Sequence, residues 1–433
     1  MLGKNDGMII KVNKNAIMQY AILYLVYILN DSYLYKYFLG KYNIILFFVG
    51  LFCILIKKIH LKYAFAYLIY SFATILFVRN YADGVGLQAF LRVAVPLIFV
   101  VIAIQINKQQ FLDRWVKLIV VMAVISLICW GIVQINADIL RNYMIMRFDA
   151  GKVVDYWISS TNAAYRTVTV DGAFLYTIRG NFELDRNNGV FSEPGLFQMM
   201  LCASLFILLF LDDMITVKGK KRMYYSMILL LTIVTCKSTS GYLSTIILLI
   251  VFFLNRRKND NTKKHIVAIA VLVISFIVGE YLWNGNSSVL YTQFLRKIIM
   301  DGKISITADT GVWRIMTINT MCKSMIEHPL GIGYDNAIKL MPTGSSGAQI
   351  FVFGAAMGII PFIVIQIWML YPVFRTSLIN RSEKVAYLFM FYNSMLAQSK
   401  EVYAVYLVFT ILFIIDVVNH GNKKMEDTEL GMV

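Results

Sequence analysis

Residues 117–135 read KLIVVMAVISLICWGIVQI, a stretch in which only the first position is charged. An α-helix needs about 20 mostly apolar residues to cross roughly 30 Å of hydrocarbon, so this stretch is long enough to span a membrane. The chain of 433 residues is 59% hydrophobic and 15% charged, whereas soluble domains are about half apolar and a quarter charged. This composition excludes a soluble globular enzyme and predicts a membrane protein.

Apolar runs of this kind recur along the chain and predict twelve transmembrane helices, some of them short because basic and aromatic side chains flank them. They lie at residues 16–30, 42–56, 63–78, 91–106, 117–135, 194–211, 224–236, 241–254, 265–283, 348–372, 385–397 and 402–418. We expect an all-α polytopic membrane protein in which residues 1–433 form a single integral membrane domain.

Lys and Arg predict the orientation, because cytoplasmic loops keep positive charge and translocated loops are depleted of it. With the N-terminus inside, more than half of the 41 basic residues fall in the cytoplasmic segments, and the C-terminus is cytoplasmic too. The formal net charge of +16 then comes mostly from the basic residues of the cytoplasmic segments. We therefore expect the lipid bilayer, and no nucleic acid, as a partner.

Two segments predicted to lie outside, 136–193 and 284–347, are about sixty residues long, where most other connections have a dozen or fewer. Connections of such length are usually functional or disordered, and the aromatic and aliphatic residues in both argue against disorder. Apolar spacing predicts helices over 289–300 and 310–327, and 166–182 alternates like a strand. We expect both segments to fold as lids on the extracytoplasmic face.

The sharpest motif is RNNGVFSEPG at residues 186–195, which ends the first long loop and opens the sixth predicted span. A carboxylate followed by proline suits the first turn of a helix, where Pro has no N–H to lose and the helix dipole favours negative charge. Glu193 is therefore either a helix-start cap or a functional group. Its location with Arg186 at the membrane boundary, facing the folded loops, favours function.

A second motif, within residues 309–336, contains DTGVWR and then HPLGIGYDN. Gly331 and Gly333 allow the backbone to approach a ligand or another segment closely, although a tight turn is the commoner use of such glycines. Small residues at 345–347, in the next predicted span and in the outside turn KSTSG at 237–241 predict close helix packing.

Cofactor motifs are missing from the sequence. It has no Walker, dinucleotide or HExxH pattern and no His pair spaced for a metal, and its five cysteines have no disulfide or metal-cluster spacing. We therefore expect no cofactor and no metal.

Together these features resemble the Wzy-type polymerases of O-antigen and capsular or exopolysaccharides, which are related to the O-antigen ligases. The resemblance covers most of the chain: about a dozen spans, large extracytoplasmic loops, a Gly-x-Phe-Ser-Glu-Pro segment entering a span, and an Arg followed by a His/Asn-Pro-Leu segment with two glycines in the last long loop. The matching residues are Gly189, Phe191, Ser192, Glu193, Pro194, Arg314, His328, Pro329, Gly331 and Gly333.

Two departures narrow this resemblance. O-antigen ligases typically place a functional His about eleven residues before a Gly near the start of the following span, and residues 343–349 contain no His, which favours polymerase over ligase. The paired Arg-x10-Gly loops described for these polymerases are not found at Arg186 or Arg314. The Arg-x10-Gly form of the polymerase site is therefore not expected in this chain.

The resemblance implies a glycosyltransferase on the outer, periplasmic face of the bacterial cytoplasmic (inner) membrane. The donor is a glycan on undecaprenyl diphosphate, and the attacking hydroxyl belongs to a second glycan on the same lipid. The activated diphosphate supplies the free energy, so no nucleotide is needed. A chain-length regulator protein is a further partner that the resemblance allows.

This chemistry requires cations for the leaving diphosphate and a base for the hydroxyl proton. Arginine suits the first role because its planar fork binds phosphate oxygens bidentately and stays charged. The first candidates for binding the diphosphate are Arg186 and Arg314, and the second are Arg179 and Arg296. The candidates for the base are Glu193 and His328.

Other functions remain open at this point. An O-antigen ligase-like glycan transferase is one alternative. A lipid-linked oligosaccharide flippase is another, although flippases usually have two similar halves and short loops. An ion-coupled transporter is less favoured because ionisable residues are few within the predicted spans.

Overall fold

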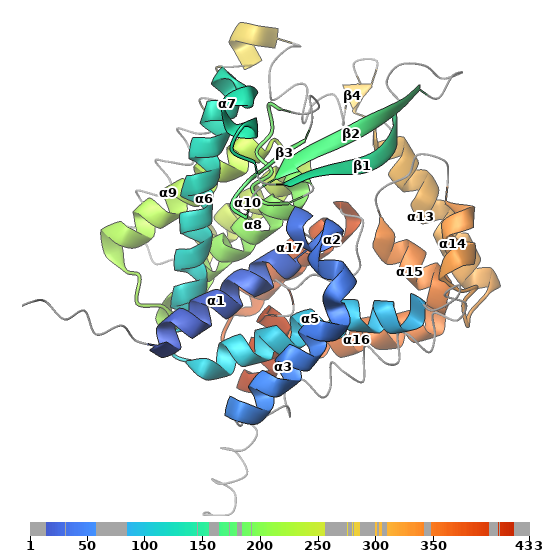
Figure 1. Ribbon diagram of the computed structural model, residues 1–433. Coiled ribbons are helices and arrows are strands. Elements are labelled where there is room, and N and C mark those ends of the chain that lie inside the picture. The colour runs from blue at the N-terminus through green and yellow to red at the C-terminus, as the bar shows by residue number, and fades with distance from the viewer. Residues whose placement is uncertain are drawn as a thin grey trace, which may run out of the picture.

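The part of the chain that the structure describes is mainly helical (Figure 1). The computed structural model describes residues 14–30, 32–57, 85–144, 146–155, 164–172, 174–179, 184–191, 193–255, 275, 279, 281–285, 299–300, 303–304, 310–341, 348–397, 406 and 408–419. Two helical segments in it, Leu39–Lys57 and Phe111–Ile135, are long and apolar enough to cross a membrane.

The helices and strands follow one another in this order. They are α1 (Lys14–Leu29), α2 (Tyr33–Tyr37), the 3-10 helix η1 (Leu39–Tyr42), α3 (Asn43–Lys57), α5 (Val85–Ile106), α6 (Phe111–Ile135), α7 (Ala137–Arg141), β1 (Met146–Asp155), β2 (Ala164–Gly172), β3 (Thr177–Arg179), α8 (Pro194–Phe210), the 3-10 helix η2 (Asp212–Met214), α9 (Gly219–Cys236), α10 (Thr239–Asn255), β4 (Ile299–Met300), β5 (Lys303–Ile304), α13 (Thr310–Glu327), α14 (Tyr334–Leu340), α15 (Gln349–Met357), α16 (Ile359–Arg375), α17 (Arg381–Ala397) and a last helix, Val408–Asn419.

Most predicted spans coincide with helices. The spans predicted at 16–30, 42–56, 91–106, 117–135, 194–211, 224–236, 241–254 and 385–397 match α1, α3, α5, α6, α8, α9, α10 and α17 to within six residues at each end. The described part of the twelfth span belongs to the last helix. The span at 63–78, and all but a few residues of the span at 265–283, lie outside the described residues.

The span predicted over 348–372 is not one continuous helix, because the chain forms two helices there, α15 and α16, which are separated by Gly358. Gly358 has a positive φ of 90°, a conformation that glycine adopts without steric cost. A Cβ on Gly358 would lie 2.2 Å from the Pro329 carbonyl oxygen and 2.3 Å from the Gly331 nitrogen. The break is therefore shaped by the segment that packs into it.

That segment is the loop at residues 328–333, which forms backbone hydrogen bonds with both helix ends. The N–H groups of Ile332 and Gly333 donate to the carbonyls of Ala355 (3.2 Å) and Ala356 (2.9 Å), and the N–H of Ile360 donates to the carbonyl of Pro329 (3.3 Å). Helix ends leave such groups without intrahelical partners. The close approach of Gly331 and Gly333 is thus to another segment of the chain.

Helix α8 lies at the centre of the packing. All its residues are buried, and it contacts α6, α9, α10 and α17. Helix α3, in contrast, is exposed on its outer face, where it carries large apolar side chains such as Phe48 (64% exposed) and Leu55 (75% exposed). A helix in a soluble core would bury such a face.

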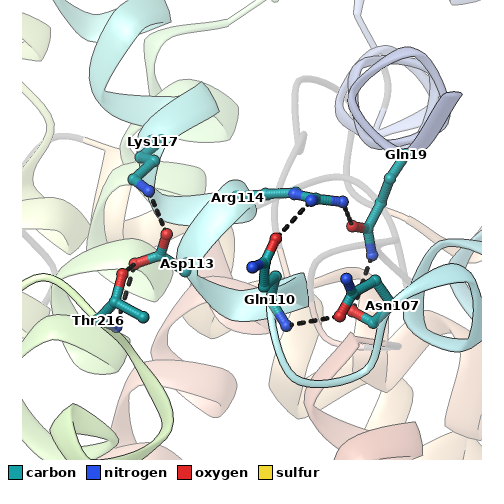
Figure 2. A network of polar contacts seen from close by, with 7 residues as sticks. All are labelled: Gln19, Asn107, Gln110, Asp113, Arg114, Lys117 and Thr216. Atoms are coloured by element: carbon teal, nitrogen blue, oxygen red, sulfur yellow. Dashed lines mark hydrogen bonds and ion pairs between the residues drawn. The ribbon is translucent and has the colours of Figure 1, made fainter. Parts of the chain in front are cut away.

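One end of the helix assembly is held together by the polar network in Figure 2. The Asp113 carboxylate accepts hydrogen bonds from the hydroxyl (2.6 Å) and the backbone N–H (3.1 Å) of Thr216, and it pairs with Lys117. Its neighbour Arg114 donates to the side chain of Gln19. These contacts join α1, the start of α6 and the loop after α8, all of which the charge pattern predicts at the cytoplasmic end.

Contacts between other helix ends form a second group. The N–H of Ala348 donates to the carbonyl of Leu396 (3.0 Å). Asn393 Nδ2 donates to the carbonyl of Ser240 (2.7 Å) and to the hydroxyl of Ser244 (2.8 Å). These residues belong to the starts of α15 and α10 and to the end of α17, which are predicted at the extracytoplasmic end.

The first long loop contains an antiparallel sheet in the order β1-β2-β3. It lies on the same side of the molecule as α7 and β4 (Figure 1). Strands β2 and β3 confirm the strand-like segment within 166–182, and α13 confirms the helix predicted over 310–327. Strand β1 was not expected.

The helix predicted over 289–300 is wrong at its end, where Ile299–Met300 pair with Lys303–Ile304 in a two-stranded hairpin. The intervening sequence is Asp301-Gly302, and Asp-Gly is a strong signal for a two-residue hairpin turn. Residues 289–298 lie outside the described residues.

We predict that Gly358→Ala lowers stability, because a Cβ meets backbone atoms from the 328–333 loop and the positive φ becomes strained. A loss of about 2 kcal/mol or more is expected and is measured as a lower thermal unfolding midpoint in detergent. Gly131→Ala is the control, because Gly131 lies within α6 and a Cβ added there would have no described atom within 4 Å. Equal midpoints for the two variants would contradict the close packing at Gly358.

Candidate functional site

The chain that leads into α8 is irregular and yet almost completely enclosed. Asn187 and Phe191 are 0% exposed, and the backbone of Phe191 forms an isolated bridge with Ser32, just before α2. Buried irregular backbone needs partners for every N–H and C=O group. In this segment the partners come from α6, α9, β3 and the start of α2.

Asn187 is the main anchor of this segment. Its N–H donates to the Thr235 carbonyl (2.9 Å) at the end of α9. Its Nδ2 donates to the hydroxyls of Ser126 (3.2 Å) and Thr235 (3.1 Å), and its Oδ1 accepts the N–H of Gly189 (3.1 Å). One amide thus ties α6, α9 and the turn before α8 together.

Two further contacts complete the anchoring. Thr177 in β3 donates its N–H (2.8 Å) and its hydroxyl (3.0 Å) to the Gly189 carbonyl, and the N–H of Tyr33 donates to the Val190 carbonyl (2.9 Å). Gly189 has a φ of 54°, and a Cβ there would lie 3.1 Å from the Phe197 ring. The segment is therefore fixed from both sides.

Two cations are held where α9 ends and α10 begins. Arg186 Nε donates to the carbonyl of Cys236 (3.3 Å), the last residue of α9. Lys237 follows in the left-handed conformation with a φ of 48°, and its Nζ pairs with Asp185 Oδ2 at 2.9 Å. Asp185 and Arg186 are consecutive, so both cations belong to one small charged cluster.

Two buried hydroxyl groups follow Lys237 in the chain, at the start of α10. Ser238 and Ser240 are 7% and 8% exposed, and their hydroxyl oxygens lie 3.2 Å apart. Gln198 of α8 donates to the Ser240 hydroxyl (3.1 Å). The start of a helix carries partial positive charge, so the N-terminal end of α10 adds to the positive field of Lys237 and Arg186.

Glu193 occupies the N-cap position of α8, with Pro194 as the first helical residue. The predicted helix start is confirmed, yet among the described residues the side chain accepts no capping hydrogen bond. Its backbone carbonyl accepts the Leu196 N–H (3.1 Å). Glu193 is partly exposed, and its carboxylate is not used to cap the helix among the described residues.

Tyr176, beside this segment, is a poor candidate for a base. It is 3% exposed, and burial raises the pKa of its phenol well above the usual value. A phenol of this kind stays protonated at neutral pH.

The second motif contains two of the candidates, Arg314 and His328. Arg314 lies near the start of α13 and His328 follows its last residue, Glu327. A rise of 1.5 Å per residue separates the two by about 20 Å. His328 is exposed, and its carbonyl accepts the Gly331 N–H (2.8 Å) in the turn that packs against Gly358. Arg314 and His328 therefore lie near opposite ends of α13.

The other candidates are placed only in part. Arg179 ends β3 and pairs in register with Val170, and only its backbone is described. Arg296 and Ser192 lie outside the described residues. No group of three or more His, Cys, Asp or Glu side chains within the described part of the chain is arranged to hold a metal ion.

Lys237 was missed as a functional candidate. Its segment, KSTSG at 237–241, was interpreted as a small-residue turn for helix packing, and Gly241 does pack against Gln198. A cation followed by three hydroxyl residues at the start of a helix was the available signal.

Comparisons with protein-family models, curated proteins and solved structures find no match for this chain. The case for its function therefore rests on the geometry of the charged cluster and of the turn before α8.

We predict that Asn187→Ala lowers the free energy of unfolding by about 2 to 4 kcal/mol, because several buried hydrogen bonds are lost together. The measurement is the thermal unfolding midpoint in detergent. The neighbouring Asn188→Ala is the matched control, since Asn188 is 3% exposed and its Oδ1 has no hydrogen-bond partner among the described residues. A control that is as damaging as Asn187→Ala would refute the anchoring role.

Proposed function

We propose that this protein is a polytopic membrane glycosyltransferase that joins lipid-diphosphate-linked glycan repeat units on the outer face of the cytoplasmic membrane. The observation that carries the proposal is the cluster of Arg186 and Lys237 at the α9–α10 junction, near the chain that presents Glu193 at the start of α8.

The membrane topology is supported by the way in which helix ends meet. Asp113 with Thr216, and Asn255 with Ser382 (2.8 Å), join segments that the Lys and Arg distribution predicts inside. Asn187 with Thr235, and Ala348 with Leu396, join segments predicted outside. This agreement, together with the exposed apolar face of α3, favours twelve spans with cytoplasmic termini.

The proposed reaction is a displacement at the anomeric carbon of the donor glycan. The acceptor hydroxyl oxygen forms the new bond to that carbon, and the bond from the carbon to the diphosphate oxygen breaks. The hydroxyl proton passes to the Glu193 carboxylate, and the diphosphate leaves with its negative charge on the lipid. No nucleotide is required, because the diphosphate is already activated.

Arg186 and Lys237 provide the charge that the leaving diphosphate needs. Their positions are fixed by the Cys236 carbonyl and by Asp185, so little reorganisation is needed as charge develops. The α10 start adds a third positive contribution. Arg314, on a different helix, is proposed to bind a second part of the lipid-linked glycans and not the same phosphate.

The proposal is tested by reconstituting the purified protein in liposomes with lipid-linked repeat units, without ATP and with a metal chelator. A ladder of longer lipid-linked glycans is expected. Movement of the repeat units across the bilayer without a ladder would replace this proposal by a flippase. Transfer of glycan to a different acceptor would replace it by a ligase-like transferase.

We predict that Arg186→Ala lowers the polymerisation rate about a hundredfold to a thousandfold, by analogy with the removal of one transition-state charge donor. Lys237→Ala is expected to lower it at least tenfold. Arg141→Ala is the control, because Arg141 is another arginine of the first long loop and is paired with Asp138 (3.0 Å) and Asp171 (3.5 Å). Rates are compared at equal amounts of inserted protein. Normal polymer length from Arg186→Ala would refute the assignment of Arg186 to the leaving diphosphate.

We predict that Glu193→Gln lowers the rate about a hundredfold, because the amide keeps the shape and cannot accept the proton. The thermal unfolding midpoint should stay that of the wild type, since the carboxylate makes no capping hydrogen bond to the described residues. Wild-type activity would eliminate Glu193 as the base, and a lowered midpoint with normal activity would assign it to the fold.

A further inference from the structure

An apolar groove lies between α16 and the last helix, Val408–Asn419. It is lined by Val364, Ile367, Trp368 and Tyr371 of α16 and by Ile414 and Val417 opposite them, and it has a volume of about 450 Å³. This volume is within the range of about 300 to 1,000 Å³ that is usual for ligand sites. Ile367 is 63% exposed and Trp368 is 43% exposed, so the groove opens to the surroundings of the helices.

A polar clamp fixes the two walls at one end. The carboxylate of Asp416, on the last helix, accepts hydrogen bonds from the Thr376 hydroxyl (2.8 Å) and from the backbone N–H of Ser377 (2.8 Å), just beyond α16. Asp416 is 9% exposed. These bonds join the last helix to the end of α16 beside the groove.

Positive charge lies at the same end. The Arg375 guanidinium carbon is 5.7 Å from the ring centroid of Tyr371, which itself lines the groove. Lys384 Nζ donates to the carbonyl of Phe374 (2.8 Å). Two carboxylates of this region are engaged, since Asp416 holds the clamp and Glu383 accepts the Asn380 N–H (2.9 Å).

We propose that this groove binds an anionic glycerophospholipid, with one acyl chain along the apolar walls and the phosphate at Arg375. The cations and the clamp belong to the end that the Lys and Arg distribution predicts to be cytoplasmic. Basic pockets between helices on that side bind anionic headgroups, and a guanidinium held on an aromatic face near an apolar groove combines both requirements. The same distribution predicts this site at the end opposite the proposed transfer site, and the proposal does not depend on the proposed function.

The test uses the full chain in nanodiscs of phosphatidylcholine, to which brominated phosphatidylglycerol or brominated phosphatidylcholine of the same chain length is added. Bromine on the acyl chain quenches tryptophan on contact, and the Trp368 signal is the difference between the wild type and Trp368→Phe. We expect phosphatidylglycerol to be preferred about fivefold, the equivalent of roughly 1 kcal/mol for one cation near an anionic headgroup.

Two variants assign the preference to its cause. Arg375→Gln should quench equally with both lipids, whereas Lys221→Gln should keep the preference. Lys221 is the matched control because its Nζ also lies over a tyrosine ring, that of Tyr225 at 5.6 Å, on a segment predicted to be cytoplasmic. Equal quenching by the two lipids in the wild type would overturn the proposal, as would a preference that survives Arg375→Gln.

Discussion

Backbone N–H and C=O groups in apolar surroundings must find partners within the protein, and this requirement governs both irregular segments of this structure. The turn before α8 gives the N–H of Asn187 to the end of α9, and the 328–333 loop bonds to the ends of α15 and α16. In both cases, groups that a helix end leaves unpaired are satisfied by a passing loop. The helices and the loops therefore stabilise each other.

The proposed chemistry follows from this rigidity. Cations are effective in charge stabilisation when they are already in position, and Arg186 and Lys237 are held by Cys236 and Asp185. The amide of Asn187 fixes the backbone next to Arg186. A site on a long loop would normally be mobile, but this one rests on the ends of two helices and on a strand.

Much of the helical content could be predicted from the sequence, because a long apolar run has few alternatives to a helix. The break at Gly358 could not, since the run at 348–372 contains no charged residue and the cause lies in Pro329 and Gly331, far away in the chain. The motif at 186–195 predicts a helix start, which is confirmed. The sequence does not reveal that the Glu193 side chain accepts no capping hydrogen bond from the described residues. The separation of Arg314 and His328 follows from the length of α13, which the sequence predicts.

The turn before α8 also bears on how this protein ages. Asn188-Gly189 is a sequence in which the glycine nitrogen readily attacks the asparagine side chain to give a succinimide, because glycine offers no steric hindrance. In the folded chain that nitrogen donates its hydrogen to Asn187 Oδ1, and the Asn188 side chain is 3% exposed. The fold thus holds the nucleophile in a hydrogen bond and keeps water away. Spontaneous deamidation at this position should therefore mark chains that have failed to fold or have lost this turn.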